Sequence, residues 1–376
     1  MDPAGEDASA AGGGRLNRRS VARGATTGRQ SAAALRAQRL ALRPAITAYG
    51  IALPPAFAER QGNAYLLPGS GAADAALVDP GPDSNESRQR LVEALAAIGL
   101  KPSALKTVVL TGWQPQRAGL VGWLGGRGGL TVVARGGVNG MAKAMADTLM
   151  GDRALETAAR WGGAPAWALQ RLRELHADRR ALQPVWQPMA SQRWLDPNPA
   201  KELRLSGHIW QARYPPGLSA ACATYWHAAS RTLIGGDLLD RSPGLRLPLP
   251  QPLQDWPDML RRVMGAWRPL SRETVDLVLP GHGAPIRSHR VLIARRLAQV
   301  KGHLTGILDA TDTVALSPWD LLLRLGPEQT DGPDLPERLA GLLALVAHLE
   351  RRGRLRREGP AAAARFRRVT GSRPPA

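Results

Sequence analysis

The chain is 376 residues long, 44% hydrophobic, and carries a formal net charge of +19 from 50 Lys and Arg against 31 Asp and Glu. This length and composition predict two or three folded domains and exclude a chain that is disordered throughout. The lone cysteine, Cys222, excludes a disulfide scaffold, and the lack of a long apolar run or secretory signal predicts a cytoplasmic protein with no membrane partner.

The N-terminal segment, residues 1–45, is rich in Ala, Gly, Ser and Arg and has no sustained apolar periodicity. This composition predicts a disordered basic tail. The segment contributes +5 to the net charge, and residues 350–376 contribute +7. Because most of the excess charge lies at the two ends, the body of the chain does not have the composition of a nucleic-acid-binding surface.

Strand and helix patterns alternate in the next part of the chain. Residues 62–67 and 75–79 are typical of two strands joined by a turn. Residues 88–98 place apolar side chains at helical spacing. The β-branched runs at 107–110 and 130–134 favour buried strands. This order predicts an α/β fold.

A helical insertion is predicted at about 138–185, where methionines cluster and strand-forming residues are few. Strand patterns then return, and the last of them runs directly into a Pro-Gly-His-Gly turn. We therefore expect one α/β domain over residues 46–290, interrupted by the insertion. The later predicted strands are 209–210, 223–226, 232–234 and 275–279.

The composition becomes helical beyond residue 287. Apolar residues recur at steps of three and four over 293–307, and two further helices are predicted at 319–325 and 339–349. Two basic strands, 353–357 and 365–369, then flank a Gly-Pro turn. Three helices followed by a basic hairpin predict a winged-helix-like domain over residues 291–376.

Five short motifs occur in a fixed order in the α/β part of the chain. They are Asn63-x-Tyr65-Leu66, Leu77-Val78-Asp79-Pro80-Gly81, Val108-Val109-Leu110-Thr111, Leu233-Ile234-Gly235-Gly236-Asp237 and Val278-Leu279-Pro280-Gly281-His282-Gly283. In order and spacing they resemble the metallo-β-lactamase-fold hydrolases over roughly residues 46–290. The resemblance implies a four-layer αββα sandwich with a two-zinc site, whose shared hydroxide attacks an ester, thioester, amide or phosphodiester. The C-terminal helices and hairpin resemble the winged-helix appendage of one branch of that family.

The resemblance also implies a set of zinc ligands, most of which this sequence lacks. After the strand that ends in Thr111, the family pattern is His-x-His-x-Asp-His, followed later by a His, a bridging Asp and a final His. Only Asp237 and His282 keep the residue type of the family at their positions. The ligand positions that differ are Gly112, Gln114, Gln116, Arg117 and Leu218.

These changes predict that the site does not hold zinc. A structural zinc ion takes four protein ligands and a catalytic one usually takes three and a water, whereas only Asp237 and His282 would remain for any metal. Arg117 adds a fixed positive charge that repels a divalent cation. We expect the Arg117 guanidinium to take the place of a metal and to pair with Asp237.

Three functions are compatible with this sequence. The first is a hydrolase relative that has lost its zinc ligands and its cofactor, and now binds or scaffolds an unidentified small molecule or protein. The second is an active hydrolase of an ester, thioester or phosphodiester, with His282 as general base and Asp237 as its orienting carboxylate.

The third function is nucleic-acid binding through the basic C-terminal hairpin. Arginines gathered on one small element are suited to phosphate contacts. Winged helices also serve as protein-docking modules, so the arginines alone do not decide between a nucleic acid and a protein as partner. The candidate contact residues are Arg354, Arg356, Arg357, Arg365, Arg367 and Arg368.

Overall fold

The computed structural model describes most of the chain from residue 38 onwards, and all described residues belong to one compact unit. Leu218 lies outside the described residues. Within the described part, no helix is long and apolar enough to cross a bilayer. The described ranges are 38–42, 46–55, 61–69, 74–127, 129–181, 192–216, 221–241, 256–326 and 331–369.

Seven strands form the first sheet, in which the spatial order follows the chain order. The first four strands pair antiparallel, and β4 to β7 pair parallel. The parallel strands β4, β5 and β6 carry the predicted β-branched and apolar runs, as expected for strands covered on both faces. The strands are β1 (Gln38–Leu42), β2 (Ile46–Leu53), β3 (Gly62–Leu67), β4 (Ala76–Val78), β5 (Thr107–Val109), β6 (Leu130–Val133) and β7 (Gln192–Leu195).

Five strands form the second sheet, in the order β12-β11-β10-β9-β8. Its pairs are antiparallel except β11 with β12, which run parallel. That parallel pair places the carboxyl ends of β11 and β12 next to each other. The strands are β8 (Glu202–Leu205), β9 (His208–Arg213), β10 (Thr224–His227), β11 (Thr232–Gly236) and β12 (Leu277–Pro280).

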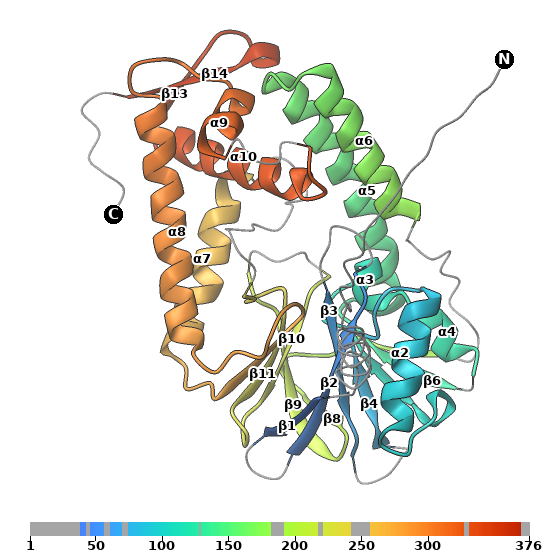
Figure 1. The fold of residues 1–376 in the computed structure, drawn as a ribbon. Coiled ribbons are helices and arrows are strands. Elements are labelled where there is room, and N and C mark those ends of the chain that lie inside the picture. Colours follow the sequence, from blue (N-terminus) through green and yellow to red (C-terminus); the bar gives the residue numbers. More distant parts are fainter. Residues whose placement is uncertain are drawn as a thin grey trace, which may run out of the picture. The chain divides into compact units, whose positions relative to one another are not determined.

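The two sheets pack face to face around a buried apolar cluster. Tyr65 and Val109 of the first sheet share this cluster with Trp210, Tyr225 and Ile234 of the second. Helices α2 (Asn85–Ala96), α3 (Pro115–Ala118) and α4 (Val121–Gly125) cover the outer face of the first sheet. Helices α7 (Trp256–Arg272) and α8 (His289–Ala310) pack against the second sheet (Figure 1). The predicted α/β architecture is confirmed.

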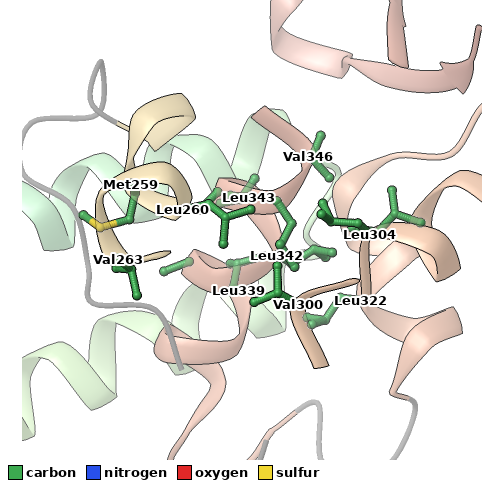
Figure 2. Close-up of a cluster of buried hydrophobic side chains, with 14 of the residues drawn as sticks. Met259, Leu260, Val263, Val300, Leu304, Leu322, Leu339, Leu342, Leu343 and Val346 are labelled. Carbon is green, nitrogen blue, oxygen red and sulfur yellow. The ribbon is translucent and has the colours of Figure 1, made fainter. Parts of the chain in front are cut away.

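The helical insertion and the C-terminal helices share one apolar core with the second sheet. The predicted insertion forms α5 (Gly137–Trp161) and α6 (Ala166–Ala181), and the C-terminal part forms α9 (Pro318–Leu325) and α10 (Leu335–Arg351). A capping box of Ser317 and Asp320 fixes the start of α9. Figure 2 shows the part of this core between α7, α8, α9 and α10, with Met259, Leu260, Val263, Val300, Leu304, Leu322, Leu339, Leu342, Leu343 and Val346 labelled.

A two-stranded hairpin, β13 (Leu355–Glu358) and β14 (Arg365–Arg368), follows α10. Phe366 of β14 pairs with Leu316 in an isolated bridge, which attaches the hairpin to the segment before α9. The three helices and the hairpin thus occur in the predicted order. Their classification as a winged-helix-like domain stays a prediction.

The prediction of a disordered tail over residues 1–45 is wrong for residues 38–42. These residues form β1, in which Leu40 lies opposite Ala48 of β2. Both side chains are buried in the core between the sheets. Among the β1 residues whose burial is described, Leu40 is buried and Gln38 and Arg39 are exposed, which gives little periodicity in an Arg- and Ala-rich segment. The other residues of that segment, 1–37 and 43–45, lie outside the described residues.

Candidate functional site

Asp79 stands at the carboxyl end of β4 and orients the loop that follows β5. Its backbone has a left-handed φ of 48°, a conformation that Asp tolerates better than most residues. One carboxylate oxygen accepts from the Thr111 N–H at 2.8 Å, and the other accepts from the Thr111 hydroxyl at 2.6 Å. The buried Asp79 side chain therefore fixes Thr111, the residue immediately before the loop of Gly112 to Arg117. No role was predicted for it from the sequence.

The Arg117 guanidinium lies between two carboxylates that come from different sheets. Arg117 is in α3, and its side chain is only 3% exposed. Its Nη1 donates to Asp79 Oδ2 at 2.8 Å, and its Nη2 donates to Asp237 Oδ1. The predicted pair of Arg117 and Asp237 is confirmed, and Asp79 is an additional partner. Burial acts to lower the pKa of Arg117, but the two carboxylates outweigh burial and raise the pKa above its ordinary value.

Gly281 leaves the space that the Arg117 guanidinium fills. A Cβ atom on Gly281 would overlap the terminal atoms of that guanidinium. The Gly281 N–H donates to the Gly236 carbonyl at 2.9 Å, so the backbone at this point is held by the neighbouring strand end. The guanidinium is therefore enclosed by Gly281 on one side and held by Asp79 and Asp237 through their oxygens.

We expect Gly281→Ala to lower the free energy of unfolding by about 1–3 kcal/mol, because the new methyl group displaces the Arg117 side chain. Chemical denaturation of both proteins measures the difference. Gly122→Ala is the matched control, since a Cβ there has open space in α4 and replacing a helical glycine with alanine stabilises by about 0.5–1 kcal/mol. Equal stability of Gly281→Ala and the wild-type chain would contradict this packing.

Two side chains of β3 hold the Pro-Gly-His turn in place. Asn63 Nδ2 donates to the Pro280 carbonyl at 3.0 Å and to the Gly283 carbonyl at 2.7 Å. The Tyr65 hydroxyl donates to the same Pro280 carbonyl at 2.7 Å. In the sequence, Asn63 and Tyr65 served only as landmarks of a motif. Their polar atoms within an otherwise apolar strand were the signal that they position the turn.

His282 is oriented by a backbone carbonyl and not by Asp237. Its Nδ1 lies 3.1 Å from the Gln61 carbonyl oxygen, which requires a proton on Nδ1 and leaves Nε2 as an acceptor. The distance from Nε2 to Asp237 Oδ1 is 4.0 Å, too long for a hydrogen bond. Burial and the nearby Arg117 charge lower the pKa of His282 below its ordinary value. At neutral pH the ring is therefore an uncharged base.

The lowered pKa predicts how His282 titrates. The unfolded chain takes up this proton near the ordinary value of 6.5 and the folded chain only at lower pH. This group therefore contributes stability at neutral pH, which is lost as the pH falls from about 6.5 through the folded-state pKa. NMR titration of the ring protons, assigned with His282→Gln, should give a pKa below 6.5. A His282 titration midpoint at or above pH 6.5 would contradict the buried position of the ring beside the Arg117 charge.

The other positions of the ligand loop are filled by contacts within the protein. Gln114 folds over Gly112, where a Cβ atom would overlap the Gln114 amide oxygen. The Gln114 Nε2 donates to Asp237 Oδ2 at 3.4 Å. Cys222 lies at the same place, and burial together with the Asp237 charge raises the pKa of its thiol to about 12. The Cys222 thiol is therefore neutral in this environment.

Comparison with known proteins agrees with this architecture. Residues 58–140 match the family model described as the metallo-beta-lactamase superfamily. "Probable metallo-hydrolase YqjP" of Bacillus subtilis (strain 168) is 25% identical over 293 residues, which is 74% of this chain and 84% of that protein. The chain is thus similar to metallo-β-lactamase superfamily proteins over part of its α/β region.

Two solved structures share the fold of this chain. A beta-lactamase domain protein from Burkholderia ambifaria has a TM-score of 0.71 and 24% identity, with 88% of this chain and 94% of that chain covered. A metallo-beta-lactamase family protein from Thermus thermophilus has a TM-score of 0.63 and 22% identity, with 86% and 98% covered. In both comparisons the matched part of this chain is larger than its two sheets. The chain therefore has the metallo-β-lactamase fold.

The described residues do not fit the zinc site that the superfamily implies. In the described part of the chain, no group of three or more His, Cys, Asp and Glu side chains is placed to hold a metal ion. Asp237 and His282 are near each other, but Arg117 occupies one Asp237 oxygen and Gln114 contacts the other. Because zinc needs three or four ligands, this arrangement supplies too few.

Five of the six candidate arginines of the basic hairpin pair with carboxylates. Arg357 donates to both oxygens of Glu350 at 2.9 Å. Such pairing offsets part of the charge that phosphate binding would use. Arg354 lies at the start of the hairpin, where its N–H donates to the Leu349 carbonyl at 2.8 Å. The other ion pairs are Arg356 and Arg367 with Glu358, Arg365 with Asp320, and Arg368 with Asp309 and Asp312.

Proposed function

We propose that this chain is a metal-independent member of the metallo-β-lactamase superfamily, which binds or scaffolds a small molecule or a protein and does not act as a zinc hydrolase. One observation carries the proposal. The Arg117 guanidinium is bonded to Asp79 and Asp237 and is buried between them. The positive charge that a metal would supply to Asp237 is thus provided by the chain itself.

Electrostatics support this proposal. A divalent ion bound by Asp237 would lie within a few ångströms of the Arg117 guanidinium, which bonds to the same carboxylate. At about 4 Å and an effective dielectric constant of about 20, the repulsion between a divalent ion and a unit charge is about 8 kcal/mol. Arg117 cannot relieve it by losing its proton, because its pKa is raised. Zinc would therefore have to displace the buried Arg117 side chain, which is hydrogen-bonded to two carboxylates.

Hydrolysis also requires an activated nucleophile. Without a metal-bound hydroxide, a protein nucleophile or a base-activated water must attack. The Cys222 thiol, next to Asp237, is buried and neutral at physiological pH because its pKa is raised to about 12. His282 is left as a base with no neighbouring nucleophile among the described residues that contact it. This supports a binding function over a catalytic one.

A hydrolysis screen tests the proposal. The full chain is assayed against ester, thioester and phosphodiester substrates, as purified, with a chelator and with added zinc. We expect rates equal to those of a buffer blank in all three conditions. Zinc-stimulated hydrolysis that is abolished by Asp237→Asn would show that the chain is a metal-dependent enzyme and would contradict the proposal.

A metal-free hydrolase is the second candidate, favoured by the state of His282. Its ring is neutral, anchored through Nδ1 and turned toward Asp237 with the basic Nε2. Such a ring can accept a proton from water. Chelator-insensitive hydrolysis that is lost in His282→Gln would establish this function in place of the first.

We propose that residues 291–376 form a winged-helix-like domain that docks a protein partner. The ion pairs within the hairpin, such as Arg357 with Glu350, support a rigid, charge-balanced module. A nucleic-acid function would instead give binding that weakens steeply with salt. Oligonucleotide binding with a steep salt slope, lost when Arg356 and Arg367 are replaced by glutamine, would favour that function.

A further inference from the structure

A surface pocket of about 410 Å³ lies where α7 and α10 meet. The described residues that line it are Asp258 and Arg261 of α7, and His348, Arg351 and Arg352 of α10. Three of these five side chains are arginines. The pocket is part of neither the Arg117 site nor the hairpin, so its function does not depend on that proposed for the ancestral zinc site.

Cations outnumber carboxylates among the residues that line this pocket. The Asp258 carboxylate accepts from Arg261 Nε at 3.1 Å and from Arg351 Nη1 at 2.7 Å. The hydrogen bond from Arg351 lowers the pKa of Asp258, so this carboxylate stays ionised at neutral pH. The Asp258 carboxylate thus neutralises one of the three arginine charges in the lining of the pocket. In the described part of the chain, Arg352 forms no ion pair, and the net charge of the lining is at least +2.

The shared carboxylate also aligns the guanidinium groups. Arg261 uses Nε for Asp258, so its terminal Nη groups carry N–H donors that no described residue accepts from. Arg351 uses Nη1 and keeps the donors on Nε and Nη2. Asp258 thus holds two forked donors around one carboxylate. This arrangement matches an anion with several oxygens better than a single point charge does.

The helices that carry the pocket are fixed relative to each other. Leu260 and Val263 of α7 are buried in one cluster with Leu342, Leu343 and Val346 of α10, as Figure 2 shows. These residues lie within one or two helical turns of the pocket residues on each helix. The arginines therefore project from a rigid base, and binding an anion would require side-chain ordering only.

The pocket differs from the neighbouring hairpin at Arg352. In the hairpin that follows α10, Arg356 and Arg357 each meet a carboxylate within 3.0 Å. In the pocket, Asp258 pairs with Arg261 and Arg351, and no described carboxylate pairs with Arg352. The described lining therefore has a net charge of +2, from three arginines and one carboxylate.

We propose that this pocket between α7 and α10 binds a small molecule that carries two or more phosphate groups. A volume of about 410 Å³ is within the range of small-molecule sites, and guanidinium groups recognise phosphate oxygens through paired hydrogen bonds. The phosphates could belong to an inorganic oligophosphate or to a nucleoside diphosphate. Both present the same chemistry to the arginines.

Isothermal titration calorimetry of the full chain with pyrophosphate, and separately with ADP, tests this proposal. The variants are Arg352→Gln, which breaks no ion pair in the described part of the chain, and the double variant Arg351→Gln with Arg352→Gln. Arg356→Gln in the hairpin is the matched control, because it removes the same charge outside the pocket. Thermal unfolding establishes that each variant is folded.

We expect pyrophosphate to bind the wild-type chain, with affinity reduced about tenfold in Arg352→Gln and further in the double variant, and unchanged in Arg356→Gln. Tighter binding of ADP would identify a nucleotide as the ligand, and equal binding would identify the phosphates alone. No heat with either ligand at millimolar concentration would overturn the proposal. So would an equal loss in Arg356→Gln, because binding would then follow net charge and not the pocket.

Discussion

Arg117→Met is expected to lower the free energy of unfolding by about 3–5 kcal/mol, because it leaves the buried Asp79 carboxylate without its cation. Arg117 and Asp79 are each 3% exposed, and their charged atoms are 2.8 Å apart. Methionine keeps most of the side-chain volume, so the effect reports the charge and the hydrogen bonds rather than a cavity. Urea denaturation of both proteins measures the difference.

Arg88→Met is the control for this substitution. Arg88 pairs with Asp83 at the surface, where its side chain is 38% exposed, and such a pair contributes less than about 1 kcal/mol. A loss for Arg117→Met as small as that for Arg88→Met would contradict the structural role of Arg117. A large loss in both variants would point to a general effect of removing positive charge.

Asp79→Asn should be the second most damaging substitution, with a loss of about 2–4 kcal/mol, because the amide cannot accept from all three of its present donors. These donors are the Thr111 N–H, the Thr111 hydroxyl and Arg117. In the double variant with Arg117→Met, both charges of the pair are absent. We therefore expect the double variant to lose less stability than the two single losses added together.

The double-mutant cycle of Arg117→Met and Asp79→Asn measures the interaction energy between the two side chains. For residues in contact, the interaction energy is about 0.5–3 kcal/mol, and we expect a value in the upper part of that range. A coupling near zero would mean that Asp79 and Arg117 stabilise the fold separately. In that case Arg117 would not act as the stabilising counter-charge of the buried Asp79 carboxylate.

Much of the fold followed from local patterns. The runs at Thr107–Val109 and Leu130–Val133 are apolar and β-branched, and both are strands of the first sheet. Strands β7 and β8 were not predicted, because Gln192–Leu195 and Glu202–Leu205 mix charged and apolar residues and are held by their neighbours. Helix α7, with Pro269 inside it, also went unrecognised.

The candidate site could be predicted only where a motif fixes the position of a residue. The family pattern assigned Arg117 and Asp237 to adjacent positions, and they are bonded. Asp79 is 38 residues from Arg117 in the chain, and no local pattern joins them. Contacts of this kind depend on how β4 and α3 pack, which the sequence specifies only through the complete fold.

Fold and chemistry are separable in this chain. The sheets, Asn63 and Tyr65 hold the turn that ends in His282, as a scaffold for a site would. The residues placed on that scaffold include a buried arginine and a glutamine that contact Asp237. Because function depends on the residues of a site and not on the fold that carries them, the metallo-β-lactamase fold does not by itself make this chain a zinc enzyme.

The most direct test of this account is the metal content of the purified full chain. The protein is dialysed against trace zinc and then against metal-free buffer, and zinc per chain is measured by plasma mass spectrometry. The account predicts a value near zero, unchanged in Asp237→Asn. One or two zinc ions held per chain, and lost in Asp237→Asn, would contradict the account and restore the zinc hydrolase as the function of this site.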